Sequence, residues 1–489
     1  MTDVTTPAEL DSPAATPVPP PAAPRRYDRS IVEGPLRSAV WKLAWPTMLT
    51  SIVGGLQGIV DQVMVGHLVG FTGNAAIGVS SQIFIVVIAF IISLFTGMSV
   101  LVSRFAGAGD EEKVNRTVYQ AFITALGISL LVLAPAGYFL APYLLDFVNA
   151  APAVQREALP FLRIMFIFSS GMMIYFMLAG ALRSAGDART PMIIGVAITL
   201  LNIAFNVVLI AGLGPIPAFG TAGAAMGTVL AMGLVAVYAF FKLWKGGWVV
   251  RFPRGEGYGP DWAIIRALFR FGLPTGIQGI AMNIGGVLLL SFVGSLAQSA
   301  ASQAAYAVSY SQLFSFITWT SMGLMGAAAA VAGQSLGAHN PDRANEAVHV
   351  AARIAVVGAA FVGIFFLFLP RQLLAVFGMH EPAVVEIGVQ LLRVLSVSGL
   401  FIAVALAYTG GLQGTGDTRS PLYISIVSQI VVPLGICFVI RETSTLQPLH
   451  IWLAILTGHI TRCVLSVVRF GQGKWRGIRV DIGEGERAR

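Results

Sequence analysis

Twelve apolar runs, each long enough to cross a lipid bilayer, constrain this chain more than any other feature. About 20 apolar residues span the hydrocarbon core of a membrane. Hydrophobic residues make up 56% of the chain and charged residues only 11%, against about 25% charged residues in soluble domains. Because a water-soluble core could not bury this much apolar surface, the sequence predicts an all-α polytopic membrane protein. The runs cover approximately residues 40–66, 75–103, 117–140, 158–182, 191–212, 220–243, 267–293, 302–335, 348–370, 387–411, 421–440 and 449–470.

Lysine and arginine are concentrated at alternate connections between these runs. If the N-terminus is cytoplasmic, 25 of the 31 basic residues lie on the cytoplasmic side, which agrees with the positive-inside rule. The distribution predicts that both termini are cytoplasmic, and it explains the net charge of +8 without a nucleic-acid partner. Residues 1–38, rich in Pro, Ala and Thr over most of their length, are expected to form a disordered tail. Residues 472–489 are expected to form a second cytoplasmic tail.

The second half of the chain repeats the first at an offset of 228 to 230 residues. Pro46-Thr47 aligns with Pro274-Thr275, and the segment 182–191 aligns with 412–421. Six spans per half is an even number, so both halves insert in the same orientation and the pseudo-two-fold axis runs along the membrane normal. The repeat therefore predicts twelve transmembrane helices in two six-helix lobes, residues 39–250 and 251–471.

Each aligned segment contains the motif Gly-Asp-x-Arg-(Ser/Thr)-Pro. Gly186 and Gly416 suit the left-handed conformation that ends a helix, and Thr190 and Ser420 suit the N-cap of the next one. The motif predicts a tight helix hairpin in each lobe. The alternative is that its arginines take part in gating.

Asp61 is a carboxylate inside the first apolar run. A charge at that depth costs at least about 2.5–3.5 kcal/mol on insertion scales, so an intramembrane acid indicates function, unless it reaches the water of the headgroup region. Asn202 and Asn206 share one face of the fifth run. Since Asp61 and Asn206 both lie on the order of 8–9 Å from the outer ends of their runs, we expect the three residues to form one site for H⁺ or Na⁺. The alternative is that the asparagines only join helices by hydrogen bonds.

Several residues are weaker candidates. Gln57 lies one turn before the intramembrane acid and could extend its site or line a substrate cleft. Met173 and Tyr175 belong to a soft, polarizable stretch that suits binding of varied ligands in a substrate cleft, but packing in the core or against lipid is the favoured explanation. Pro46 and Pro274 could act as hinges or as static kinks.

Five stretches together resemble the multidrug and toxic compound extrusion (MATE) family: WPT…VDQVMVG at 45–66, LRSAGDARTPM at 182–192, LNIAFN at 201–206, PTG…FVG at 274–294 and LQGTGDTRSPL at 412–422. The resemblance implies a monomeric antiporter of a bacterial inner (cell) membrane with no cofactor. It would export drug-like, often cationic amphipathic compounds in exchange for H⁺ or Na⁺, with Asp61 carrying the ion. NorM-type members have further acids on the seventh and tenth helices. Here the seventh run reads GIQGIAMNIGG and the tenth has no carboxylate, which favours a DinF-like site in the N-terminal lobe.

Two other functions remain open at this point. A flippase for lipid-linked oligosaccharides, from the same superfamily, would require a cationic cleft. An intramembrane enzyme would require paired acids or a His–Asp constellation within the spans. For the antiporter, H⁺ is favoured over Na⁺, because asparagine at position 206 leaves only one formal negative charge to hold a metal ion.

Overall fold

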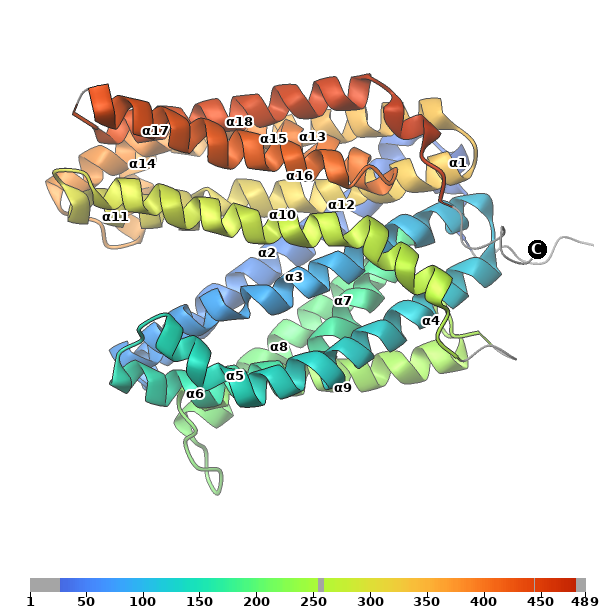
Figure 1. Cartoon of the computed structure of the whole chain (residues 1–489), viewed down its shortest axis with the longest axis horizontal. Coiled ribbons are helices and arrows are strands. Elements are labelled where there is room, and N and C mark those ends of the chain that lie inside the picture. Colours follow the sequence, from blue (N-terminus) through green and yellow to red (C-terminus); the bar gives the residue numbers. More distant parts are fainter. Residues whose placement is uncertain (1–26, 254–258, 444, 481–489) are drawn as a thin grey trace, which may run out of the picture.

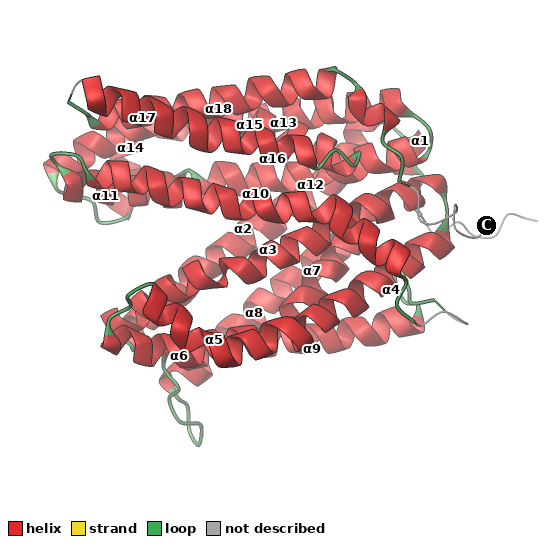
Figure 2. Cartoon of the chain, in the orientation of Figure 1, coloured by secondary structure: helices red, strands yellow, loops and turns green. Residues whose placement is uncertain are grey.

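The computed structural model describes residues 27–253, 259–443 and 445–480. The elements in these ranges are helices joined by loops (Figure 2). Eleven helices are long and apolar enough to cross a bilayer, and a bent helix pair brings the number to twelve. The prediction of an all-α protein with twelve spans is confirmed.

The first half of the chain forms the lower lobe in Figure 1. Its helices are α2 (Leu36–Leu68), α3 (Phe71–Ala108), α4 (Glu111–Ile128), α5 (Ala134–Phe147), α6 (Pro152–Ile167), α7 (Ser169–Ser184), α8 (Arg189–Ala211) and α9 (Thr221–Lys245). A π-helical turn, η1 (Ser129–Leu133), joins α4 and α5 into one continuous span.

The fourth expected span is bent, because α6 and α7 meet at an angle of 50°. Phe168 leaves the helical conformation at the break, with φ −103° and ψ 23°. Two contacts hold the bend: Ser169 Oγ lies 2.8 Å from Ser129 Oγ, and Gly171 packs against the backbone of Gly233 in α9. The apolar run at 158–182 gives no indication of this break.

The second half of the chain forms the upper lobe. Its helices are α10 (Trp262–Gly294), α11 (Ser299–Tyr306), α12 (Ser315–Gly337), α13 (Pro341–Phe368), α14 (Pro370–Val376), α15 (Pro382–Gly414), α16 (Arg419–Ile426), α17 (Val432–Thr443) and α18 (Pro448–Gly471). Two further π-helical turns, η2 (Ala307–Leu313) and η3 (Val427–Val431), join α11 to α12 and α16 to α17.

The two lobes meet at one end of the molecule and diverge toward the other (Figure 1). We call the end where they meet, which also holds both described termini, the closed end, and the opposite end the open end. The contact is made by α2 against α12, α10 against α3, and α3 against α12. Since α2 and α10 are repeat-equivalent, as are α3 and α12, the first two contacts are related by the pseudo-two-fold axis.

Glycines allow the backbones of the two lobes to approach closely at the closed end. A Cβ atom on Gly107 would lie 2.0 Å from the carbonyl oxygen of Gln334, and one on its equivalent Gly337 would lie 2.1 Å from the carbonyl oxygen of Arg104. Side chains larger than glycine cannot occupy these positions without moving the lobes apart. The closed end is therefore a seam between two backbones.

The expected tail at 1–38 is wrong for residues 27–38. Residues 1–26 lie outside the described part, but α1 (Ser30–Glu33) is helical and α2 begins at Leu36. Ile31 is completely buried, and Nη2 of Arg343 donates to the carbonyls of Ile31 and Gly34, each at 2.8 Å. An apolar side chain and a guanidinium from the opposite lobe thus dock this segment.

The expected cytoplasmic tail at 472–489 is folded against α18 where the structure describes it. A 3₁₀ turn, η4 (Lys474–Gly477), places Trp475 against Phe470 with ring centroids 4.9 Å apart. The indole nitrogen of Trp475 donates to the carbonyl of Phe470 at 2.9 Å. Residues 481–489 lie outside the described part.

The two motif hairpins form as predicted, with one difference at the caps. Gly186 and Gly416 have φ values of 104° and 97°. However, α8 and α16 begin one residue before Thr190 and Ser420, and the preceding aspartates do the capping. The carboxylate of Asp187 accepts from the backbone N–H of Thr190 at 3.0 Å, and the second copy repeats this contact at 3.2 Å.

Candidate functional site

Asp61 lies on α2 and contacts α8 inside the N-terminal lobe. Nδ2 of Asn206 donates a hydrogen bond of 2.8 Å to Oδ1 of Asp61. Asn202 and Asn206 are completely buried, one turn apart on the same face of α8. The structure therefore brings together the three residues that the sequence places at matching depth.

The second amide completes the contact with the carboxylate. With the Asn202 nitrogen facing Asp61, Nδ2 lies 2.9 Å from Oδ1 of the acid, and the amide oxygen accepts from the hydroxyl of Thr228 at 3.0 Å. Thr228 lies on α9 and was not predicted as a site residue. α9 begins at Thr221 at the open end, and Thr228 lies seven residues further along. This depth matches that of the other three residues, and it is the sequence feature that could have identified Thr228 as a site residue.

A glycine fixes the position of the second asparagine. A Cβ atom on Gly227 would lie 2.0 Å from Oδ1 of Asn206, so the backbone of α9 packs directly on this amide. The same oxygen is buried and has no hydrogen-bond partner in the described residues. The site thus contains carboxylate, amide and hydroxyl oxygens, the ligands that hard cations prefer, but both amides present their nitrogens and not their oxygens to Asp61.

Along the helices, the site is bordered by polar side chains on one side and by apolar side chains on the other. Toward the closed end, Oε1 of Gln57 accepts from the hydroxyl of Thr199 at 2.9 Å, which extends the polar cluster by one turn. Toward the open end lies an apolar layer formed by Val65, Ile77, Ile210 and Ala224. Val65, Ile210 and Ala224 are one turn beyond Asp61, Asn206 and Thr228. Beyond this layer the hydroxyl of Thr221 donates to Glu157 at 2.7 Å. The apolar layer separates the site from the Glu157 carboxylate.

Met173 and Tyr175 lie in the core and do not line a cleft, as the favoured of the two explanations predicts. Met173 is completely buried and Tyr175 is 7% exposed, both in the core of the N-terminal lobe. The Tyr175 hydroxyl fills the space beside Gly195, where a Cβ atom would lie 2.8 Å from it. Core packing, the simpler reading of this stretch, accounts for both residues.

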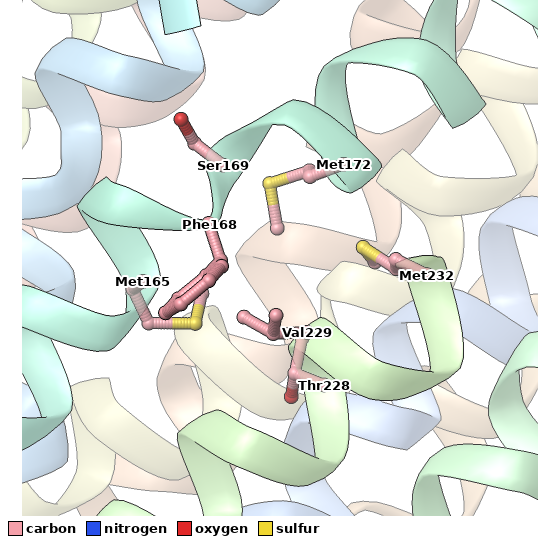
Figure 3. A pocket seen from close by; sticks show the side chains of 7 residues that line it. All are labelled: Met165, Phe168, Ser169, Met172, Thr228, Val229 and Met232. Carbon is pink, nitrogen blue, oxygen red and sulfur yellow. The ribbon is translucent and has the colours of Figure 1, made fainter. Parts of the chain in front are cut away.

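Other methionines line a small cavity beside the site (Figure 3). Met165, Met172, Met232 and Thr228 are among its lining residues, and its volume is about 10 Å³. A single water requires about 10–15 Å³, so in this conformation the cavity is too small for a drug-like molecule.

The two prolines lie at the lobe contact rather than in the polar cluster. Pro46 is buried inside α2 and Pro274 is buried inside α10, and both helices continue through them. The hydroxyl of Thr50 donates to the carbonyl of Pro46 at 2.8 Å. Their role as hinges stays a prediction.

Comparison with known proteins agrees with the internal repeat. The sequence profile of the MatE family matches residues 46–208 and 274–439, once in each half. The probable multidrug resistance protein NorM of Thermotoga maritima is 26% identical over 448 residues, which cover 90% of this chain and 93% of that protein. The multidrug resistance protein MdtK of Pectobacterium atrosepticum is 26% identical over 436 residues, with coverages of 87% and 93%.

Solved structures show the same fold. An outward-facing MATE family transporter of the MOP superfamily superposes with a TM-score of 0.83 at 22% identity, covering 92% of this chain and 98% of that one. A MOP superfamily transporter from Pyrococcus furiosus gives a TM-score of 0.83 at 23% identity, with the same coverages. Since the family profile matches more than half of the chain, this multi-pass membrane protein belongs to the MatE family of multidrug transporters and is not an enzyme.

Proposed function

We propose that this protein is a cation-coupled antiporter that exports small, often cationic amphipathic compounds, and that Asp61 carries the coupling ion. The observation that supports this most directly is the contact of one intramembrane carboxylate with two buried amides, Asn202 and Asn206. An acid inside the membrane has a high free-energy cost, so its presence indicates a function. A packing role alone would not require it.

The donor set favours H⁺ over Na⁺. Both amides direct N–H groups at Oδ1 of Asp61, which leaves the other carboxylate oxygen to take up a proton. A metal ion would require these amides to turn their oxygens inward. Asp61 also supplies the only formal charge of the cluster. We therefore assign H⁺ as the physiological ion, with Na⁺ as a competitor.

The distribution of basic residues assigns the closed end to the cytoplasm, so this conformation would face outward. Transport would then follow from rocking of the two lobes about the seam, with Pro46 and Pro274 as hinges. The ion site would lie entirely in the N-terminal lobe, as in the DinF-like arrangement. We place the protein in a bacterial inner membrane as a monomer that needs no cofactor.

Efflux from proteoliposomes tests this function. The purified protein is reconstituted, and export of the cationic dye ethidium is followed while pH and Na⁺ gradients are imposed separately. We expect the pH gradient to drive export and Asp61→Asn to abolish it. Glu157→Gln is the matched control, because that carboxylate lies behind the apolar layer, and it should retain transport.

Two results would contradict the proposal. One is wild-type accumulation by Asp61→Asn, which would remove the coupling role. The other is translocation of a lipid-linked oligosaccharide without any gradient-driven dye export, which would favour the flippase.

A further inference from the structure

A cavity of about 50 Å³ lies between the lobes near the closed end. Twelve residues line it, six from each lobe, and every residue from the N-terminal lobe has a repeat-equivalent partner 230 positions later in the chain. Arg183 of α7 and Gln413 of α15 form one such pair. Because all lining residues fall into repeat-equivalent pairs, the cavity lies on the pseudo-two-fold axis.

The two halves of the cavity differ in chemistry although they are equivalent in position. The N-terminal lobe contributes Arg183 and the hydroxyls of Thr96 and Ser99. At the positions equivalent to Thr96 and Ser99, the C-terminal lobe has Gly326 and Ala329. None of the twelve lining residues is a carboxylate. The positive charge and the hydroxyl groups of the cavity thus lie on the N-terminal side, and the C-terminal side contributes one polar side chain, Gln413.

Arg183 has no ion pair or hydrogen bond in the part of the chain that the structure describes. Its guanidinium lies over the ring of Phe95, 4.9 Å from the centroid, and its position in the last turn of α7 is favourable for a cation. Neither contact supplies a negative charge. Ser99 Oγ is buried and also lacks a partner.

The Arg183 side chain is partly buried and lines this cavity, and a cation in such a position is stabilised by an anionic partner. We propose that this cavity binds a small monovalent anion of the size of chloride, with Arg183 as its main partner and the hydroxyls of Thr96 and Ser99 and the amide of Gln413 as further donors. A water requires about 10–15 Å³, so about 50 Å³ accommodates a halide with one or two waters. It excludes a drug-sized anion.

The anion is tied to one arrangement of the lobes. Its partners come from both lobes, so the site is complete only while they touch at the closed end. A ligand that binds one conformation shifts the population toward it. Chloride therefore stabilises the closed seam, and it does so independently of ion binding at Asp61.

Thermal unfolding of the purified full-length protein tests the site. Chloride is exchanged for gluconate, which is too large for the cavity, at constant ionic strength. We expect a saturable rise in melting temperature with chloride for the wild type, and the same rise for Arg189→Gln, a control arginine in the same aligned segment that does not line the cavity. Arg183→Gln copies the equivalent residue of the other lobe and should weaken the chloride response at least about tenfold, the loss expected for a charged hydrogen-bonding partner.

The readout is the dependence on chloride, so a general loss of stability in a variant does not imitate the result. Ser99→Ala, which copies Ala329, should weaken the response less than Arg183→Gln does. Crystals soaked in bromide should show an anomalous peak between Arg183 and Gln413. A chloride response that is absent from the wild type, or equal in Arg183→Gln and wild type, would overturn the proposal, as would bromide bound only elsewhere.

Discussion

Arg104 and Gln334 occupy equivalent positions in the two lobes, and each donates a hydrogen bond to a backbone carbonyl of the opposite lobe. Nη2 of Arg104 lies 3.0 Å from the carbonyl oxygen of Thr415. Nε2 of Gln334 lies 2.7 Å from the carbonyl oxygen of Ser184. These reciprocal bonds join the lobes at the ends of their motif hairpins, next to the glycines that allow the backbones to approach.

A methyl group at this seam should favour separation of the lobes. Gly337→Ala places a Cβ atom against the carbonyl of Arg104, and overpacking of this kind costs about 1–3 kcal/mol. We expect the closed-end distance distribution, measured by spin labels on the two lobes, to shift toward longer distances. Gly358→Ala in α13 is the control, because the nearest atom to its Cβ would be 3.8 Å away, and it should leave the distribution unchanged. Equal distributions for both variants would show that the seam is not tightly packed.

The glycine behind Asn206 should be required for transport. Gly227→Ala would displace the amide from Asp61, at a cost of about 1–3 kcal/mol, and reduce dye export to the level of Asn206→Ala. Gly233→Ala on the same helix is the control, since no atom lies within 4 Å of its Cβ position. Retention of full export by Gly227→Ala would mean that the amide contact is not needed.

A second carboxylate should change the ion preference. Asn206→Asp places two acids within hydrogen-bond distance and provides two formal charges for a metal ion. We expect Na⁺ to raise the melting temperature of this variant with an apparent affinity at least about tenfold above the wild type, because each additional charged partner contributes about 1.5–3 kcal/mol. Asn202→Ala with Asn206→Asp should lose part of the gain. An unchanged Na⁺ response would argue that the cluster cannot coordinate a metal.

Two N-terminal truncations should differ in stability, because only the longer one removes the docked segment. Removal of residues 1–26 should leave the melting temperature unchanged. Removal of residues 1–34 also deletes Ile31 and the carbonyls that Arg343 binds, and should cost about 2 kcal/mol at about 1 kcal/mol per hydrogen bond. Arg343→Lys in the full-length chain should fall between the two. Equal stability of both truncations would mean that α1 contributes nothing to the closed end.

The architecture was predictable because long apolar runs and a constant repeat offset leave few alternatives. The contact of Asp61 with Asn206 followed from their depths, since neighbouring spans of the same direction bring residues of equal depth together. The spacing of Thr228 from Thr221 indicates its depth, but its contact with Asn202 also required knowing that α9 packs beside α8. The bend at Phe168 could not be predicted, because there is no proline or glycine at the break. Contacts with η1 and α9 hold it instead. The docking of Ile31 depends on a guanidinium from the opposite lobe, and that of Trp475 depends on a turn that stacks it on Phe470.

The lone carboxylate of the N-terminal site limits the energy available to each transport cycle. If Asp61 exchanges one proton for one monovalent organic cation, no net charge crosses the membrane, and only the pH difference drives accumulation, at about 1.4 kcal/mol per pH unit. A neutral substrate would leave one charge uncompensated, so the membrane potential would add about 2.3 kcal/mol per 100 mV. The same protein would therefore concentrate neutral compounds more steeply than cationic ones across an energised membrane.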